Sequence, residues 1–424
     1  MKTWEKPKVP VLPGAPPTLK LRDSLDGRIK DHQREQLNLW VCGITPYDAT
    51  HLGHANTYVF FDVLLRTWID GGRPARYAQN LTDMDDPLYE RAQATQVYWR
   101  ALAQDQTDLF RSDMVHLRVI PPDSWVSVSE KLDDLESAVR VMEKNGIAYR
   151  IQNSNGTEDI YVDSALDLKF VESDYFDNLN LELEFNEHGG DSQRTGKRHA
   201  LDPQVWKGVR GDDYRPADLE DGEWRPGWHI ECAVIAHDEL GMVDVQGGGS
   251  DLLFPHHEMS ELHLRQLRTD FNDGEKYESD SNPVGFHLHS GMVAFEGTKM
   301  SKSLGNLVLV SKLVAQGVDP RAIRLAILSH HYREDWEYET AVLDKSVQRL
   351  KYWQEVVGLG FDDDATSVGP DLLAEVRFQL SEDLRTPDAI DAIDRRFSGI
   401  QKWKNVEDRQ LVIDTIDALL GVKL

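Results

Sequence analysis

Residues 40–54 read WVCGITPYDATHLGH. The stretch begins as a short apolar run, leaves that run at Gly43 and turns at Pro46. An apolar helical pattern over residues 57–70 follows His51 and ends at a pair of glycines, where helices often stop. The pattern predicts a strand, a loop and a helix start. In an open parallel sheet such a loop lies at the carboxyl edge, where ligands bind beside helix N-termini.

The rest of the chain continues this alternation of strands and helices. Residues 76–81 read as a second strand and complete a βαβ unit. Ser127 and Glu130 have the spacing of a capping box and predict a helix start. Later strands are predicted at residues 243–246 and 285–289. The last of them leads into the loop that carries Lys299 and Lys302.

We therefore expect an α/β protein with a Rossmann-like parallel sheet, an insertion between its two halves, and a helical C-terminal part. The insertion is predicted because residues from about 150 to 224 are polar and weakly periodic. The expected segments are an N-terminal arm (1–37), the first half of the sheet domain (38–120), the connective insertion (121–224), the second half of the sheet domain (225–310), a helical region (311–360) and a C-terminal helical domain (361–424).

Composition limits the partners of the protein. The 424 residues include 47 Lys and Arg against 73 Asp and Glu, which gives a net charge of −26. This balance argues against a large RNA partner, because phosphate contacts need a basic surface. There is no apolar run of 18 residues and no signal pattern, so we expect a cytoplasmic protein without membrane contact. We also expect a monomer, although the sequence does not reveal the oligomeric state.

The two cysteines of the chain are candidate metal ligands. Cys42, Cys232 and His256 each follow a predicted strand end or helix start, and such ends converge in one α/β domain. Two thiolates and an imidazole suit Zn²⁺, and three protein ligands leave a fourth position open for substrate. We expect one zinc ion per chain. The acidic cluster of Asp83, Asp85 and Asp86 more often caps a helix than binds a metal.

The fourth zinc ligand is the open question in this set. Ser260 lies four residues after His256 and on the same helical face, but serine is a poor zinc ligand. Glu261 lies five residues after His256, so in a helix with 3.6 residues per turn it points to a different side from His256. His257 and Glu261 form a rival i, i+4 pair, which we expect to face away from a site built by His256.

Two motifs carry a resemblance to a known family. His51-Leu52-Gly53-His54 resembles the HIGH motif of class I aminoacyl-tRNA synthetases, and residues 299–303 match their KMSKS motif. Residues 42–48, 226–232, 247–252 and 254–258 are similar to the cysteinyl-tRNA synthetases, in which zinc binds the thiolate of the cysteine substrate. That family carries a Glu as fourth zinc ligand where this chain has Ser260.

The resemblance implies roles for named residues. His51, His54, Lys299 and Lys302 would stabilise phosphate charge while ATP, with Mg²⁺, activates L-cysteine. The implied pocket for the cysteinyl-adenylate is formed by Cys42, Gly43, Ile44, Thr45, Thr57, Asn80, Leu81, Thr82, Trp228, Gly249, Ser250, Asp251 and Val293. Ser250 and Asp251 would hold the adenosine.

The chain differs from the cysteinyl-tRNA synthetases in features that point to a relative that does not act on RNA. Only 121 residues follow residue 303, and residues 304–424 carry 15 Lys and Arg against 21 Asp and Glu. Gln246 and Ser260 replace a usual His and Glu. The whole chain resembles the ligases of mycothiol biosynthesis, which join cysteine to glucosaminyl-inositol. The alternatives are a cysteinyl-tRNA synthetase with a reduced tail and a non-catalytic zinc or regulatory module.

Overall fold

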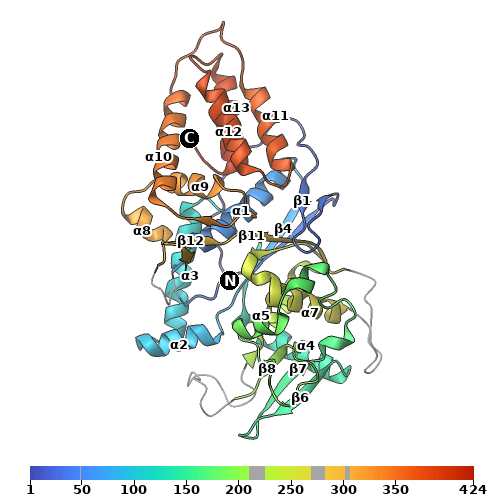
Figure 1. Ribbon diagram of the computed structural model, residues 1–424. Coiled ribbons are helices and arrows are strands. Elements are labelled where there is room, and N and C mark those ends of the chain that lie inside the picture. The colour runs from blue at the N-terminus through green and yellow to red at the C-terminus, as the bar shows by residue number, and fades with distance from the viewer. Residues whose placement is uncertain (48, 210–224, 269–281, 301–305) are drawn as a thin grey trace.

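The structure is a computed structural model that describes residues 1–47, 49–209, 225–268, 282–300 and 306–424. Its centre is a five-stranded parallel sheet with the strand order β11-β10-β3-β4-β5. Strands β4 and β11 of this sheet are labelled in the middle of the molecule in Figure 1. The strands are β3 (Leu37–Val41), β4 (Ala75–Leu81), β5 (Ser124–Ser127), β10 (Val243–Gly249) and β11 (Val284–Ser290). This confirms the predicted α/β class.

Helices cover both faces of this sheet, because both faces are apolar. Side chains alternate along a strand, so Leu39 and Val41 of β3 pack in one core while Trp40 packs in a second core. Helix α1 (Leu52–Ile69) belongs to the first core, and helix α6 (Trp228–Leu240) belongs to the second. The β3–α1 connection therefore leaves the sheet at its carboxyl edge, between the two layers.

The segment between β4 and β10 adds helices and a second sheet. The helices are α2 (Asp86–Thr95), α3 (Trp99–His116), α4 (Leu132–Lys144) and α5 (Leu181–Glu187). An antiparallel sheet is formed by β6 (Ala148–Gln152), β7 (Glu158–Val162), β8 (Gln204–Lys207) and β9 (Arg225–Pro226), below the central sheet in Figure 1. Ser127 and Glu130 make the capping box that the sequence predicts, in a 3₁₀ turn just before α4.

Smaller strands and a helix bundle complete the chain. The N-terminal arm forms a hairpin of β1 (Lys20–Arg22) and β2 (Ile29–Asp31). A small sheet contains β12 (Val293–Phe295), β13 (Thr298–Lys299) and β14 (Trp336–Glu337). The later helices are α7 (Glu258–Arg268), α8 (Val310–Ala315), α9 (Pro320–Leu328), α10 (Thr340–Val357), α11 (Gly369–Ser381), α12 (Thr386–Ser398) and α13 (Val406–Leu420).

The structure differs from the sequence prediction at two boundaries and in one additional helix. Helix α1 begins at Leu52 rather than at residue 57, because the His51 side chain accepts a hydrogen bond from the Gly53 N–H and caps the helix. Strand β5 pairs with β4 in the central sheet, so the first half of the sheet domain extends beyond residue 120. Helix α2 was not predicted, although Asp85 caps it and a proline lies in its first turn.

Candidate active site

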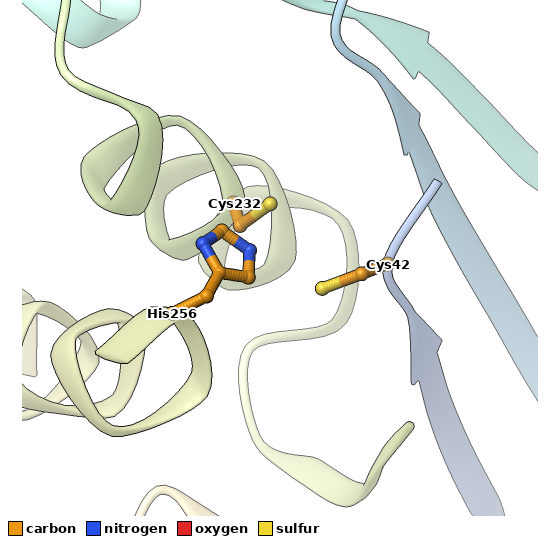
Figure 2. A group of neighbouring side chains, drawn as sticks. All are labelled: Cys42, Cys232 and His256. Carbon is orange, nitrogen blue, oxygen red and sulfur yellow. The ribbon is translucent and has the colours of Figure 1, made fainter. Parts of the chain in front are cut away.

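Three buried side chains meet at the carboxyl edge of the central sheet. Cys42 follows β3, Cys232 lies on α6, and His256 lies in the wide turn before α7. One ligand atom of each lies within 4.8 Å of the other two. Figure 2 shows the sulfur of Cys42 directed toward the other two side chains, which come from separate elements. The structure thus brings together the three predicted metal ligands, Cys42, Cys232 and His256, here called the metal-ligand group.

The chemistry of this group fits a metal ion. His256 Nε2 is buried and has no hydrogen-bond partner among the described residues, so no other side chain competes with a metal for this nitrogen. The Trp228 ring stacks on the His256 ring with centroids 4.1 Å apart. Burial raises the pKa of Cys42, but a hydrogen bond with Cys232 and the charges of His257 and His256 outweigh it and hold that pKa low, whereas the same hydrogen bond and burial raise the pKa of Cys232. Metal ions bind the thiolate form of cysteine.

The neighbours of His256 differ from the sequence prediction in one respect. His257 does not face away from the group, because its Nε2 lies 3.2 Å from Cys42 Sγ. Residues 253–257 form a π-helical turn with Phe254 in an extended conformation, so α-helical spacing does not apply there. Ser260 donates its hydroxyl hydrogen bond to the His229 carbonyl at 3.1 Å. Glu261 instead accepts from His287 Nε2 at 2.7 Å.

A cavity of about 810 Å³ opens beside the metal-ligand group. Such a volume is typical of small-molecule sites, which span roughly 300–1,000 Å³. Its lining includes the predicted site residues Cys42, Gly43, Ile44, Thr45, His51, His54, Thr57, Trp228, Gly249, Asp251 and Val293. Residues that are far apart in sequence therefore converge on one pocket, as the resemblance implied.

The two motif histidines lie together on one side of this cavity. The rings of His51 and His54 have centroids 3.9 Å apart. Gly53 between them has no room for a side chain, because an added Cβ would approach the His51 ring to 2.8 Å. The pair sits at the N-terminus of α1, where the positive end of the helix dipole favours an anion. This end of the cavity suits phosphate.

Three predicted site residues lie outside the cavity lining: Asn80, Leu81 and Thr82. The Asn80 side-chain oxygen accepts a hydrogen bond from the Gly43 N–H at 2.7 Å, and its Nδ2 donates to Thr82 at 3.0 Å. Leu81 is buried in the core around α1. Thr57, which does line the cavity, lies 2.7 Å from the Ser290 hydroxyl.

The remaining predicted residues have different placements. Ser250 is exposed and does not line the cavity, whereas its neighbour Asp251 does. Lys299 belongs to β13, but its side chain lies outside the described part of the structure, as does all of Lys302. Met300, between them, is buried and lines the cavity.

One wall of this cavity was not predicted from the sequence. Helix α2 contributes a row of residues to the lining: Pro87, Glu90, Arg91 and Ala94. They recur at the i, i+3, i+4 and i+7 spacing of one helical face. The cap at Asp85 and the following proline could have located the helix, but polar residues on an exposed face do not reveal a pocket.

Comparisons with known proteins agree with this geometry. The model of the family described as tRNA synthetases class I (C) catalytic domain matches residues 28–348. An L-cysteine:1D-myo-inositol 2-amino-2-deoxy-alpha-D-glucopyranoside ligase from Clavibacter michiganensis is 46% identical, with 100% of this chain and 99% of that protein covered. A protein of the same name from Sanguibacter keddieii is also 46% identical, with both chains fully covered.

Solved structures share the fold at low sequence identity. A Mycobacterium tuberculosis methionyl-tRNA synthetase bound by methionyl-adenylate aligns with a TM-score of 0.61 and 14% identity, over 91% of this chain and 92% of that one. A leucyl-tRNA synthetase from Agrobacterium radiobacter aligns with a TM-score of 0.63 and 11% identity, over 91% and 83%. None of the helices in the described ranges has both the length and the apolar character that crossing a bilayer requires.

Proposed function

The chain belongs to the class I synthetase family and, within it, to the L-cysteine:1D-myo-inositol 2-amino-2-deoxy-alpha-D-glucopyranoside ligases, and on this basis we propose the reaction that it catalyses. The carboxylate of L-cysteine attacks the α-phosphate of ATP, which forms cysteinyl-AMP and releases pyrophosphate. The amine of glucosaminyl-inositol then attacks the activated carbonyl. A C–N bond forms, the bond between the carbonyl carbon and the phosphate oxygen breaks, AMP leaves, and the amine nitrogen releases one proton.

Selection of cysteine is assigned to the metal-ligand group. Cys42, Cys232 and His256 would hold Zn²⁺, because thiolates and imidazole are among its preferred ligands and His256 Nε2 has no hydrogen-bond partner among the described residues. When bound, zinc supplies an open coordination position for the thiolate of the substrate. A serine or alanine lacks this soft ligand and is rejected without an editing step.

A second part of the cavity lining is assigned to the nucleotide. His51 and His54 would hold the phosphates at the α1 N-terminus, and Asp251 would hold the adenosine side. Lys299 and Lys302 would neutralise the pyrophosphate, together with Mg²⁺. Phosphoryl transfer of this kind depends on positioning and charge stabilisation, and no protein nucleophile is required.

The observation that carries the proposal is that one cavity contacts both sets of residues. Its lining includes Cys42 and Trp228 of the thiol site together with His51, His54 and Asp251, which are assigned to the nucleotide. A cysteine thiol and an ATP phosphate can therefore occupy one continuous space. A monomeric state, a cytoplasmic location and the absence of an RNA partner stay predictions from the sequence.

The test is the choice of acceptor. The protein is incubated with ATP and cysteine and then offered either glucosaminyl-inositol or a tRNA pool, while AMP release and cysteine transfer are measured. We expect transfer to the amino sugar alone. Transfer to tRNA would support the alternative cysteinyl-tRNA synthetase. Absence of cysteine-dependent ATP–pyrophosphate exchange would favour the non-catalytic zinc or regulatory module.

A further inference from the structure

One wall of the cavity has no role in cysteine activation as proposed above. It is the face of α2 formed by Pro87, Glu90, Arg91 and Ala94, here called the α2 wall. The other side of the helix is buried in the second core through Leu88, Tyr89 and Ala92. The helix therefore presents one face, which carries Glu90 and Arg91, to the pocket while its apolar face anchors it.

The α2 wall is held rigidly at its N-terminal end. The Asp85 side chain caps the helix by accepting from the Asp86 N–H at 2.8 Å. The carboxylate of Asp86 lies 3.1 Å from Lys207 Nζ on β8, and Asp85 lies 3.5 Å from the buried Arg225 on β9. These contacts tie α2 to the sheet of the insertion. A wall supported in this way can bind a ligand in one orientation.

The remaining cavity space needs an occupant. The metal-ligand group takes the thiol of cysteine, and the α1 N-terminus takes the phosphates, so these substrates lie along two sides of the pocket. The proposed reaction also requires an amine to reach the cysteinyl carbonyl between them. Since the acceptor must enter the same cavity, it must contact the lining that the first two substrates leave uncovered.

The chemistry of the α2 wall matches an amino sugar. Glu90 is exposed on the cavity, and its carboxylate has no hydrogen-bond or ion-pair partner among the described residues. A carboxylate binds an ammonium group and sugar hydroxyls through charge-assisted hydrogen bonds. We propose that the α2 wall is the acceptor subsite, with Glu90 binding the amine-bearing sugar and Ala94 leaving room for its ring. This inference rests on the proposed function.

The test separates acceptor binding from cysteine activation. Glu90→Gln removes the charge at constant shape, and Ala94→Trp fills the space beside it. Both variants should raise the KM for glucosaminyl-inositol at least tenfold. Cysteine-dependent ATP–pyrophosphate exchange, measured without acceptor, should stay within twofold of the unaltered protein. Gln93→Ala is the matched control, because Gln93 is exposed on the same helix and does not line the cavity.

Each other result contradicts the inference in a distinct way. If the acceptor KM is unchanged in both variants while the unaltered protein transfers cysteine, the subsite lies elsewhere and the proposed function stands. If pyrophosphate exchange falls in step with amide formation, α2 acts on the first half-reaction instead. If the unaltered protein exchanges pyrophosphate but transfers no cysteine to the amino sugar, the proposed acceptor is wrong and the subsite assignment fails with it.

Discussion

His257 Nε2 lies 3.2 Å from Cys42 Sγ. On the other side of the same ring, His257 Nδ1 lies 2.7 Å from His289 Nε2, and all three side chains are buried. A thiolate at Cys42, the form that binds a metal, accepts a hydrogen bond from His257 Nε2, and His257 Nδ1 in that tautomer accepts from His289 Nε2. The two histidines thus form a hydrogen-bonded chain that orients Cys42, a predicted metal ligand.

His257→Asn should therefore weaken metal binding without removing a ligand. Loss of a side chain that orients a metal ligand lowers metal affinity by about 10- to 100-fold. Competition with a coloured chelator measures this affinity directly and does not depend on enzyme activity. His330→Asn is the control, because His330 stacks on Trp336 and does not contact the metal-ligand group. Equal affinities in the two variants would show that the His257–Cys42 contact has no part in metal binding.

Cys42→Ser and Cys232→Ser should each abolish both zinc binding and cysteine activation. A serine hydroxyl replaces a thiolate poorly as a zinc ligand, so zinc content should fall from one ion per chain toward zero. Cysteine-dependent ATP–pyrophosphate exchange should disappear in the same variants. Metal analysis by atomic absorption and the exchange assay give independent readouts. A zinc-free variant with full exchange activity would refute the metal assignment.

Lys302→Ala should separate catalysis from metal binding. The lysine belongs to the KMSKS-like loop and is predicted to neutralise charge on the departing pyrophosphate. Pre-steady-state formation of cysteinyl-AMP should slow by about 10²-fold, the scale of losing one charge-stabilising group. Zinc content should be unchanged. A zinc-depleted variant would mean that the loop supports the metal centre instead.

The metal-ligand group could be predicted because of sheet topology. Cys42, Cys232 and His256 lie far apart in sequence, yet each follows a strand or opens a helix. The carboxyl ends of parallel strands meet at one edge whatever the length of the connections. Residue type and position in the βα alternation were therefore sufficient to bring the three together.

His257 and the α2 wall could not be found in the same way. The prediction for His257 assumed 100° per residue, and the π-helical turn before α7 breaks that spacing. The polar residue Glu90 looks like any solvated side chain in sequence. Its place on the cavity depends on how α2 packs against the rest of the domain, which local patterns do not encode.

Gly43→Ala should destabilise the protein and disturb the site. An added Cβ would lie 1.7 Å from the Asn80 carbonyl oxygen, so the strand-end backbone would have to move. Overpacking of this kind costs about 1–3 kcal/mol in the free energy of unfolding, which urea denaturation measures. Gly399→Ala is the matched control, since its added Cβ would meet nothing closer than the Arg396 carbonyl oxygen at 3.7 Å. Similar losses in both variants would contradict the steric argument.

The buried pair of His287 and Glu261 should make stability fall at alkaline pH. Burial alone lowers the pKa of His287, but the carboxylates of Glu261 and Asp23 outweigh it and raise that pKa to about 10 from 6.5. The folded state thus holds a proton that the unfolded state loses above pH 6.5. The stabilisation is complete below pH 6.5 and is lost as pH rises through 10, at about 1.4 kcal/mol per pH unit.

The measurement compares urea unfolding at pH 7 and pH 9 for the unaltered protein and for His287→Gln. The unaltered protein should lose more of its free energy of unfolding between these pH values, because the variant has no proton to release at this position. Histidine-selective NMR of the unaltered protein gives a second readout that does not require the variant to fold. The His287 imidazole should stay protonated through pH 8.5, since Glu261 accepts its Nε2 proton at 2.7 Å in a buried setting. A His287 resonance that titrates near pH 6.5 would show that the carboxylates do not hold the imidazolium, and the predicted pH dependence would then fail.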